Sequence, residues 1–351
     1  MLVAAVLAIT LLTNWPGTLR NILADLRFAW QSRAATGDVV VVAIDAPSIE
    51  QIGVWPWPRR LHAELLRRLD AAGVSEVAFD VDFSTPSDPE SDRSFLNALQ
   101  AAGGSTVLPA FRQAGANGAT YFNRPLLQFR DQVWTASVNV AIEPDGLARR
   151  YSFGQTLDSE FLPSMAAVLA GRFDADKRNF LIDFSIRSTT IPTISYVDVL
   201  RGDQATLDRL KDKKVIVGGT ALELGDRFSV PNGGILAGPV LQALAADSLL
   251  QGRALRWTSA VVSAAGLVLL ALAMTLIWRR ISAGMRAVSL VVIAFAIEAV
   301  GFVLQARYPL VLDTALFQIA VAVYIAAVAL DEIDIRALLG RIAESRFQRI
   351  A

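Results

Sequence analysis

Aspartates, tryptophans and arginines follow the apolar segments of this sequence. Side chains at the ends of such segments are positioned to contact a ligand. Two apolar segments, residues 38–45 and 75–84, finish in or contain aspartates. The box "WPWPR" follows the first of them, and an arginine follows the glycine-ended run "VIVGG". The candidate ligand-binding residues are Asp45, Trp55, Trp57, Arg59, Asp80, Asp82 and Arg227.

These residue types at strand ends predict a polar pocket with aromatic walls. In open α/β sheets, ligands bind outside the carboxyl ends of the strands, and small-molecule sites combine apolar walls with a few polar groups. Two other interpretations remain open. The aspartates can cap helices or pair with arginines, and Asp45, Asp80 and Asp82 can together hold a cation.

Several chemistries are disfavoured by composition. The chain has no cysteine and a single histidine, His62, so we expect no zinc site and no Ser-His-Asp catalysis. The motif "VGGT" lacks the lysine of a phosphate-binding loop. We therefore predict no catalytic residue, no metal and no cofactor. The formal net charge is zero, which argues against a nucleic-acid partner.

The elements that must position these residues follow from hydrophobic patterning. Residues 38–45 and 75–84 are expected to be buried strands, and residues 61–73 the helix between them, which makes a parallel βαβ unit. Further strands are expected at 105–111, 179–185 and 214–220, and two more around the Pro-Asp-Gly turn within 134–153. Helices are expected at 94–104, 162–171 and 238–252. The predicted fold class is α/β, with a mixed, largely parallel sheet covered by helices.

The box "WPWPR" has a conformation that proline restricts. Pro56 and Pro58 each push the preceding residue towards extended backbone, and Pro58 suits the first turn of a helix. Trp55 and Trp57 are then rigid anchors between strand and helix. They either pack against the fold or form a pocket wall, and Arg59 is the residue expected to decide between these alternatives.

The hydrophobic content of 53% is concentrated in the C-terminal third. The apolar runs 257–278, 287–306 and 309–330 each have about 20 residues, enough to cross a membrane as a helix. Arg279, Arg280 and Arg286 in the first connection predict that it faces the cytoplasm. Residues 14–256 would then be extracytoplasmic, residues 1–13 the end of a first membrane helix or a cleaved signal, and residues 331–351 a cytoplasmic juxtamembrane helix.

Two polar side chains interrupt these runs. Glu298 and Gln318 lie at matching depths of antiparallel helices, so they are expected to form an intramembrane polar pair. Helix-packing contact and proton sensing are both open interpretations of this pair.

Several stretches resemble the CHASE2 domain family. They are "VVVVAIDAPSIEQIGVWPWPRRLHAELLRRLDAAGVSEVAFDVDFSTPSDPESD", "VNVAIEPDGLARR", "IPTISYVDVL" and "LKDKKVIVGGTALELGDRFSVP", followed by the three apolar runs. The resemblance covers roughly residues 20–330. The last outer helix of the family tends to carry a histidine-alanine pair where this chain has Gln242 and Ala243.

The resemblance implies the sensing and signal-transducing part of a bacterial transmembrane receptor. Its multi-pass membrane bundle would lie in the bacterial inner membrane, with the sensor domain in the periplasm. Such receptors couple to a cytoplasmic nucleotide cyclase, an EAL or GGDEF domain, or a kinase, so this chain itself is expected not to be an enzyme. A small-molecule or protein stimulus and a homodimer are the expected partners. The alternatives are a membrane-anchored scaffold that binds an envelope protein and, from the aspartates alone, an extracytoplasmic enzyme.

Overall fold

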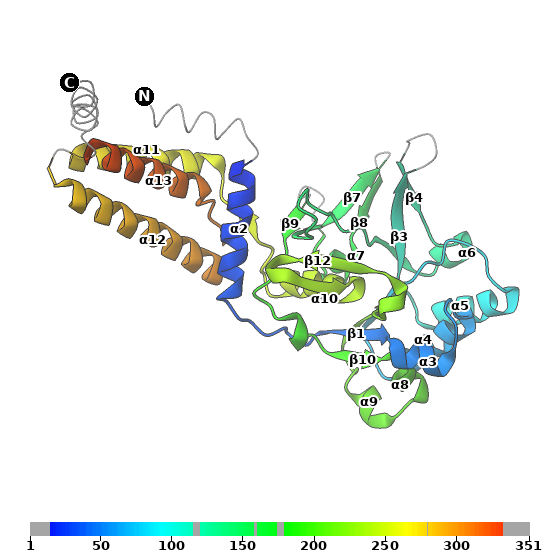
Figure 1. Ribbon diagram of the computed structural model, residues 1–351. Helices are drawn as coiled ribbons and strands as arrows, with labels where there is room; N and C mark the ends of the chain where they lie inside the picture. The colour runs from blue at the N-terminus through cyan, green and yellow to red at the C-terminus, as the bar shows by residue number, and fades with distance from the viewer. Residues whose placement is uncertain (1–14, 115–119, 158–159, 174–178, 279, 333–351) are drawn as a thin grey trace, which may run out of the picture. The chain divides into compact units, whose positions relative to one another are not determined.

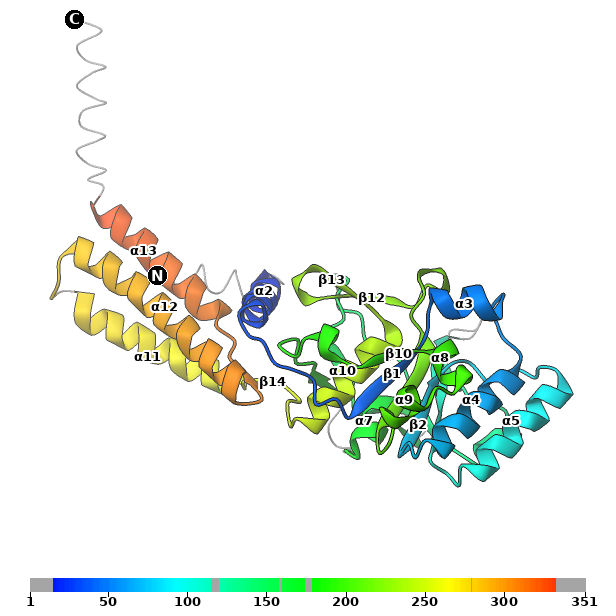
Figure 2. The ribbon, with the colours of Figure 1, turned by 90° about the horizontal axis from the view of Figure 1, so that it is seen from below.

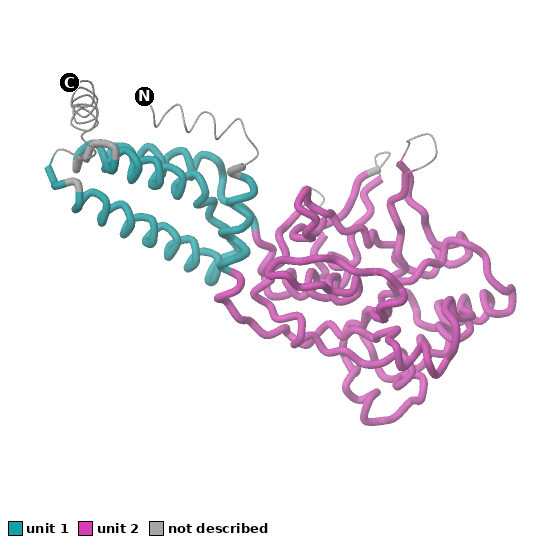
Figure 3. Tube along the Cα trace, viewed as in Figure 1, with its two compact units in different colours: residues 1–27, 256–351 teal, residues 28–255 magenta. Residues whose placement is uncertain are grey.

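The computed structural model describes residues 15–114, 120–157, 160–173, 179–278 and 280–332. Figure 3 shows two compact units, one formed by residues 28–255 and the other by residues 1–27 and 256–351. The expected membrane segment 1–13 lies outside the described residues, as does nearly all of the expected juxtamembrane helix. Each unit buries apolar side chains of its own.

The unit of residues 28–255 contains a seven-stranded sheet with the order β10-β1-β11-β2-β3-β4, in which β5 also pairs with β3. All its pairings are parallel except that of β3 with β4. The strands are β1 (Val39–Ile44), β2 (Glu76–Asp80), β3 (Thr106–Ala114), β4 (Thr120–Asn123), β5 (Trp134–Ser137), β10 (Thr193–Ser195) and β11 (Lys214–Gly219). A mixed, largely parallel sheet is confirmed.

The sheet separates two hydrophobic cores, because successive side chains of a strand point to opposite faces. Val39, Val41 and Ala43 of β1 belong to one core and Val40, Val42 and Ile44 to the other. All six residues are buried, which explains the unbroken apolar run of this strand.

Helices cover both faces of the sheet (Figures 1 and 2). One core contains side chains of α7 (Met165–Ala170) and α10 (Gly238–Leu250), and the other those of α4 (Arg59–Ala71), α5 (Pro89–Ala101) and α8 (Tyr196–Arg201). The shorter helices are α3 (Ala46–Ile52), α6 (Leu127–Arg130), α9 (Gln204–Asp208) and the 3-10 turns η1 (Ser188–Thr190), η2 (Leu222–Leu224) and η3 (Pro231–Gly233).

This unit also contains three antiparallel strand pairs. They are β6 (Arg150–Ser152) with β9 (Asn179–Leu181), β7 (Gly154–Leu157) with β8 (Glu160–Pro163), and β12 (Arg227–Val230) with β13 (Gly234–Ala237). Two strands were expected around the Pro-Asp-Gly turn, and they form, but they do not pair with each other. β5 instead joins β3 of the main sheet and β6 joins β9, while across the turn Ala141 forms an antiparallel bridge with Arg150 and the Glu143 N–H donates to the Leu147 carbonyl.

Two further expectations need correction at the start of the sheet. The second strand ends at Asp80 and not at residue 84, so Asp82 lies in the following loop. A helix that was not expected, α3, follows β1 directly. β11 lies between β1 and β2, a long-range insertion that local patterning does not reveal.

The second unit contains α11 (Ala260–Trp278), α12 (Ala283–Arg307), α13 (Ala315–Glu332) and the short pair β14 (Arg256–Trp257) with β15 (Leu310–Val311). It also contains the helix α2 (Trp15–Ala29) as far as Arg27, where the boundary between the units lies. The first apolar run therefore begins in β14, and the third contains β15 near its start, so neither run is helical from its first residue. In the part of the chain that the structure describes, residues Gly284–Arg307 form the one helix long and apolar enough to cross a membrane. The apolar helical segments Ala260–Leu276 and Ala315–Ala329 are shorter, so a membrane bundle of three spans is not confirmed.

Candidate functional site

A cavity of about 760 Å³ lies at the carboxyl edge of the parallel sheet. There Asp80 ends β2 and is paired in register with Gly218 of β11. The lining comes from the Trp-Pro box, the start of α4, the loop after β2 and the segment of η2 to Asp226. Of the seven predicted residues, Trp55, Trp57, Arg59, Asp80 and Asp82 line this cavity.

The two tryptophans of the box have different environments. Trp57 is buried at 5% exposure, its indole N–H donates to the Gly53 carbonyl at 2.8 Å, and its ring packs on Tyr196 at 4.9 Å between centroids. Trp55 is only partly buried and meets the Trp57 ring edge to face at 5.3 Å. Trp57 therefore anchors the box in the core, and Trp55 supplies the aromatic wall of the cavity.

Arg59 lines the cavity and connects three segments of its wall. Its Nη1 donates to Asp92 on α5 at 2.7 Å, and its Nη2 donates to the Thr85 carbonyl in the loop after β2. The guanidinium also lies 5.5 Å from the centre of the Phe83 ring and 5.4 Å from that of Phe129. Because its charge is matched by a buried carboxylate, Arg59 is chiefly a clamp that holds the wall of the cavity in place.

His62 lines the cavity from the first turn of α4 and is 2% exposed. Its Nδ1 lies 3.0 Å from the Tyr196 hydroxyl. Burial, and secondly the charge of Arg59, lower the pKa of His62 to about 3, so the ring is neutral at physiological pH. His62 is therefore a buried histidine paired with a tyrosine hydroxyl.

Asp80 is a polar residue of the cavity lining at the end of β2. Its carboxylate accepts a hydrogen bond of 2.6 Å from Gln242 Nε2 on α10. Burial, and secondly the neighbouring carboxylate of Asp226, raise the pKa of Asp80 to about 8. Asp226 and Gln242 were not among the predicted site residues, although Gln242 marked the departure from the family's histidine.

The other predicted residues lie elsewhere or at the rim. Asp45 caps α3: it accepts from the Ser48 backbone N–H at 3.0 Å and from the Ser195 hydroxyl at 2.9 Å. Arg227 is exposed at the start of β12, donates to the Thr220 carbonyl, and does not line the cavity. Asp82 is an exposed rim residue that accepts from the Ser84 N–H.

Asp45, Asp80 and Asp82, the three aspartates of the alternative cation site, do not converge. Asp45 accepts hydrogen bonds at the start of α3, and Asp82 accepts one within its own loop. Across the described ranges, no group of three or more histidine, aspartate or glutamate side chains is placed to hold a metal ion together. The separation of Asp45 from the cavity removes the geometry that the alternative cation site required.

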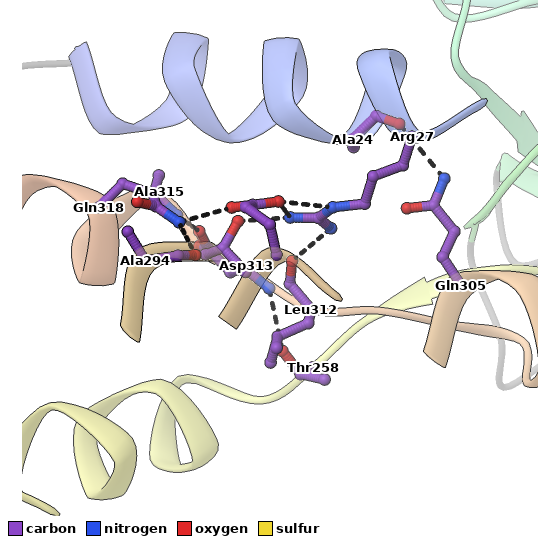
Figure 4. A network of polar contacts seen from close by, with 11 residues as sticks. Ala24, Arg27, Thr258, Ala294, Gln305, Leu312, Asp313, Ala315 and Gln318 are labelled. Carbon is purple, nitrogen blue, oxygen red and sulfur yellow. Dashed lines mark hydrogen bonds and ion pairs between the residues drawn. The ribbon is translucent and has the colours of Figure 1, made fainter. Parts of the chain in front are cut away.

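The second unit contains a polar network among apolar helices (Figure 4). Arg27 of α2 donates to the Glu298 carboxylate on α12 from Nε at 3.0 Å and from Nη2 at 2.9 Å, and to the Leu312 carbonyl at 3.0 Å. Gln318 of α13 donates to the other Glu298 oxygen at 3.0 Å. Glu298 and Gln318 are thus hydrogen-bonded, as expected of the pair, and Arg27 is a third member that the sequence analysis did not identify.

A small residue makes room for this network. A Cβ on Gly301 of α12 would lie 3.0 Å from Arg27 Cζ, closer than side chains normally pack. The signal that could have revealed Arg27 was the glutamate itself, because a charge among apolar helices requires an opposite charge nearby.

We expect Arg59→Ala to lower the free energy of unfolding by about 3–5 kcal/mol, because it leaves the Asp92 carboxylate buried without its partner charge. The exposed pair of Arg67 and Glu64 on the same helix gives a matched control. Arg67→Ala should cost about 1 kcal/mol or less. Urea denaturation followed by circular dichroism measures both, and equal losses would contradict the clamp.

The raised pKa of Asp80 predicts a pH-dependent stability difference. Between about pH 4, where an aspartate in the unfolded chain ionises, and about pH 8, the folded protein keeps a proton that the unfolded chain has lost. Wild-type stability should therefore fall with pH across this window relative to Asp80→Asn, and the difference should level off above about pH 8. Urea midpoints at pH 5, 6.5, 8 and 9 test this; a difference independent of pH would rule it out. The exposed Asp131→Asn serves as control.

Removing the network anion should destabilise the second unit. We expect Glu298→Ala to cost on the order of 3 kcal/mol, because Arg27 is 5% exposed and would remain as an uncompensated charge. Arg20→Met removes the longer pair with Asp313 at 3.9 Å and should cost about 1 kcal/mol or less. Melting temperatures of the detergent-purified chain compare them, and a larger effect of Arg20→Met would refute the central position of Glu298.

Comparison with models of protein families gives a match. The model of the CHASE2 domain matches residues 1–277, from the N-terminal segment to the end of α11. No curated protein and no solved structure matches the chain. The matched region contains the whole sheet, the tryptophan box and the cavity, and it is the larger part of the sequence. The chain therefore belongs to the CHASE2 domain family, whose members are extracytoplasmic sensor domains of membrane receptors.

Proposed function

We propose that this chain is the sensing and signal-transducing part of a bacterial receptor, and that the cavity at the carboxyl edge of the sheet binds the stimulus. The observation that carries the proposal is the cavity of about 760 Å³, whose lining combines the Asp80 carboxyl group with the aromatic side chain of Trp55. A volume of this size falls in the range that small-molecule sites occupy.

The construction of the cavity supports a sensing role, because its walls belong to separate elements. Trp55 precedes α4, Asp80 ends β2, and Asp226 follows η2. A ligand that contacts all three would favour one arrangement of these elements over another. Such a difference in affinity between arrangements is the only means by which a ligand can shift a conformational equilibrium.

We further propose that the second unit carries the signal through the bacterial inner membrane. The chain enters the sheet from α2 and leaves it through α10 towards α11, so two covalent connections join the units. In this proposal α11, α12 and α13 span the membrane, the sheet is periplasmic, the receptor is a homodimer, and a cyclase, an EAL or GGDEF domain, or a kinase is the cytoplasmic output.

The proposed topology can be tested with single cysteines, because the chain has none of its own. Asp131→Cys in the sensor unit and Tyr308→Cys after α12 should react with a membrane-impermeant maleimide in intact spheroplasts. Gly284→Cys, where an added Cβ meets no neighbour, should react only after permeabilisation. Labelling of Gly284→Cys in intact spheroplasts would overturn the orientation.

The proposed binding function can be tested by thermal-shift screening of the full chain in detergent against small molecules of varied charge. At least one compound should raise the melting temperature by several degrees, and Trp55→Ala should remove the shift because it removes the cavity wall. The exposed Trp30→Ala, at 82% exposure and outside the cavity, is the matched control. A screen without a hit, together with stoichiometric co-purification of an envelope protein, would favour the scaffold instead.

A further inference from the structure

The charge of the cavity limits the class of its ligand, given the proposed function. One arginine lines it, and that charge is already matched by Asp92 at 2.7 Å. His62 is neutral. Carboxyl groups supply the remaining charge and leave the cavity negative, with Asp80 adding its charge only above about pH 8. They are Asp80, Asp82, Asp88, Glu223 and Asp226.

Two neighbours of Asp80 have unused hydrogen-bond capacity, although neither of them belongs to the cavity lining. Gln242 gives its amide N–H to Asp80, while its Oε1 is buried and has no hydrogen-bond partner in the described parts of the chain. The hydroxyl of Tyr151 is likewise buried without a partner there, and burial, followed by the charge of the nearby Asp80, raises its pKa. Gln242 is 2% exposed and Tyr151 is 1% exposed. Unpaired buried polar atoms are costly and require a reason.

These atoms match one kind of chemical group. A primary ammonium carries three N–H donors and a positive charge, as lysine does. The Asp80 carboxylate is an acceptor in the cavity lining, and Gln242 Oε1 and the Tyr151 hydroxyl oxygen are unpaired polar atoms near Asp80 but outside that lining. A cation there would also relieve the repulsion between Asp80 and Asp226, which now contributes to the raised pKa of Asp80.

The rest of the wall suits an organic cation better than a metal ion. Trp55 and the partly buried side chains of Val81 and Leu224 offer apolar surface to a carbon chain. Aromatic faces also attract organic cations. The described residues include no group of three carboxylate or imidazole side chains placed to ligate a metal.

We propose that the cavity binds a small organic amine, with its ammonium group at Asp80 and its carbon chain against Trp55. The proposal rests on the cavity being the stimulus site, and it names the class of that stimulus. An anionic or neutral ligand would leave the carboxylates uncompensated.

A pH dependence follows from the same geometry. Below about pH 8 Asp80 holds a proton that the ammonium must displace, so amine binding should tighten from pH 6 to pH 8 and release a proton. The titratable and charged groups around Asp80 are Asp226 and Tyr151 beside it, and Arg59, His62, Asp82, Asp88 and Glu223 along the cavity.

The test is isothermal titration calorimetry of the full chain in detergent with putrescine, its neutral counterpart butanediol, and magnesium chloride. We expect putrescine to bind, and butanediol and magnesium to bind at least tenfold more weakly. Asp80→Asn, which keeps an acceptor for Gln242, should weaken putrescine at least tenfold. Glu223→Gln at the rim should weaken it about twofold, and Glu50→Gln on α3, outside the cavity, should leave it unchanged.

The outcomes separate this inference from the proposed function. Equal binding of putrescine and butanediol, preferential binding of magnesium, or an unaffected Asp80→Asn would overturn the amine. If a neutral or anionic compound binds and Trp55→Ala abolishes its binding, the cavity remains the stimulus site and only its ligand class is wrong. If neither putrescine nor any screened compound binds in a manner sensitive to Trp55→Ala, both proposals fail.

Discussion

The parallel strands β1, β11 and β2 are buried on both faces, and most of the sensor unit follows from this constraint. Burial on both faces requires helices on both sides, which α4, α5 and α8 supply on one face and α7 and α10 on the other. The fit is close: a Cβ on Gly218 would lie 2.4 Å from Pro239 Cγ at the start of α10. With both faces covered, the strand ends are where backbone and polar side chains can meet a ligand, and the cavity lies there.

The protonation of the polar side chains at this edge depends on burial and on the charged groups next to them. Arg59 is held by Asp92, and its charge helps to keep His62 neutral. Asp80 has an amide donor as its hydrogen-bond partner, and burial, followed by the nearby carboxylate of Asp226, raises its pKa to about 8. The edge therefore combines an arginine whose charge is neutralised by Asp92 with an aspartate, Asp80, whose neighbouring charged group is another carboxylate. This contrast is the physical basis for placing a cationic ligand at Asp80 and not at Arg59.

The same principle governs the helical unit. A carboxylate among apolar helices is costly unless an opposite charge and hydrogen bonds meet it. Arg27 and Gln318 donate hydrogen bonds to Glu298, and Arg27 also donates to the Leu312 carbonyl. Gly301 provides the space for Arg27. The network links α2 with α12 and α13, so the helix that leads into the sensor sheet is bonded to the C-terminal helices.

The sequence by itself determined the α/β class, the buried strands, the main helices and the family, because hydrophobic periodicity and proline geometry are local properties. It also indicated the sheet edge and five of the residues that line the cavity. Only the tertiary structure decided that β11 separates β1 from β2, that Asp45 is a helix cap, and that Asp226, Gln242 and Tyr151 surround Asp80. The partners of Asp80 lie far from it in sequence, and no local pattern records which distant side chains share a buried space. For the same reason the glutamate in α12 was evident from the sequence, whereas Arg27, 271 residues away, was found only in the folded chain.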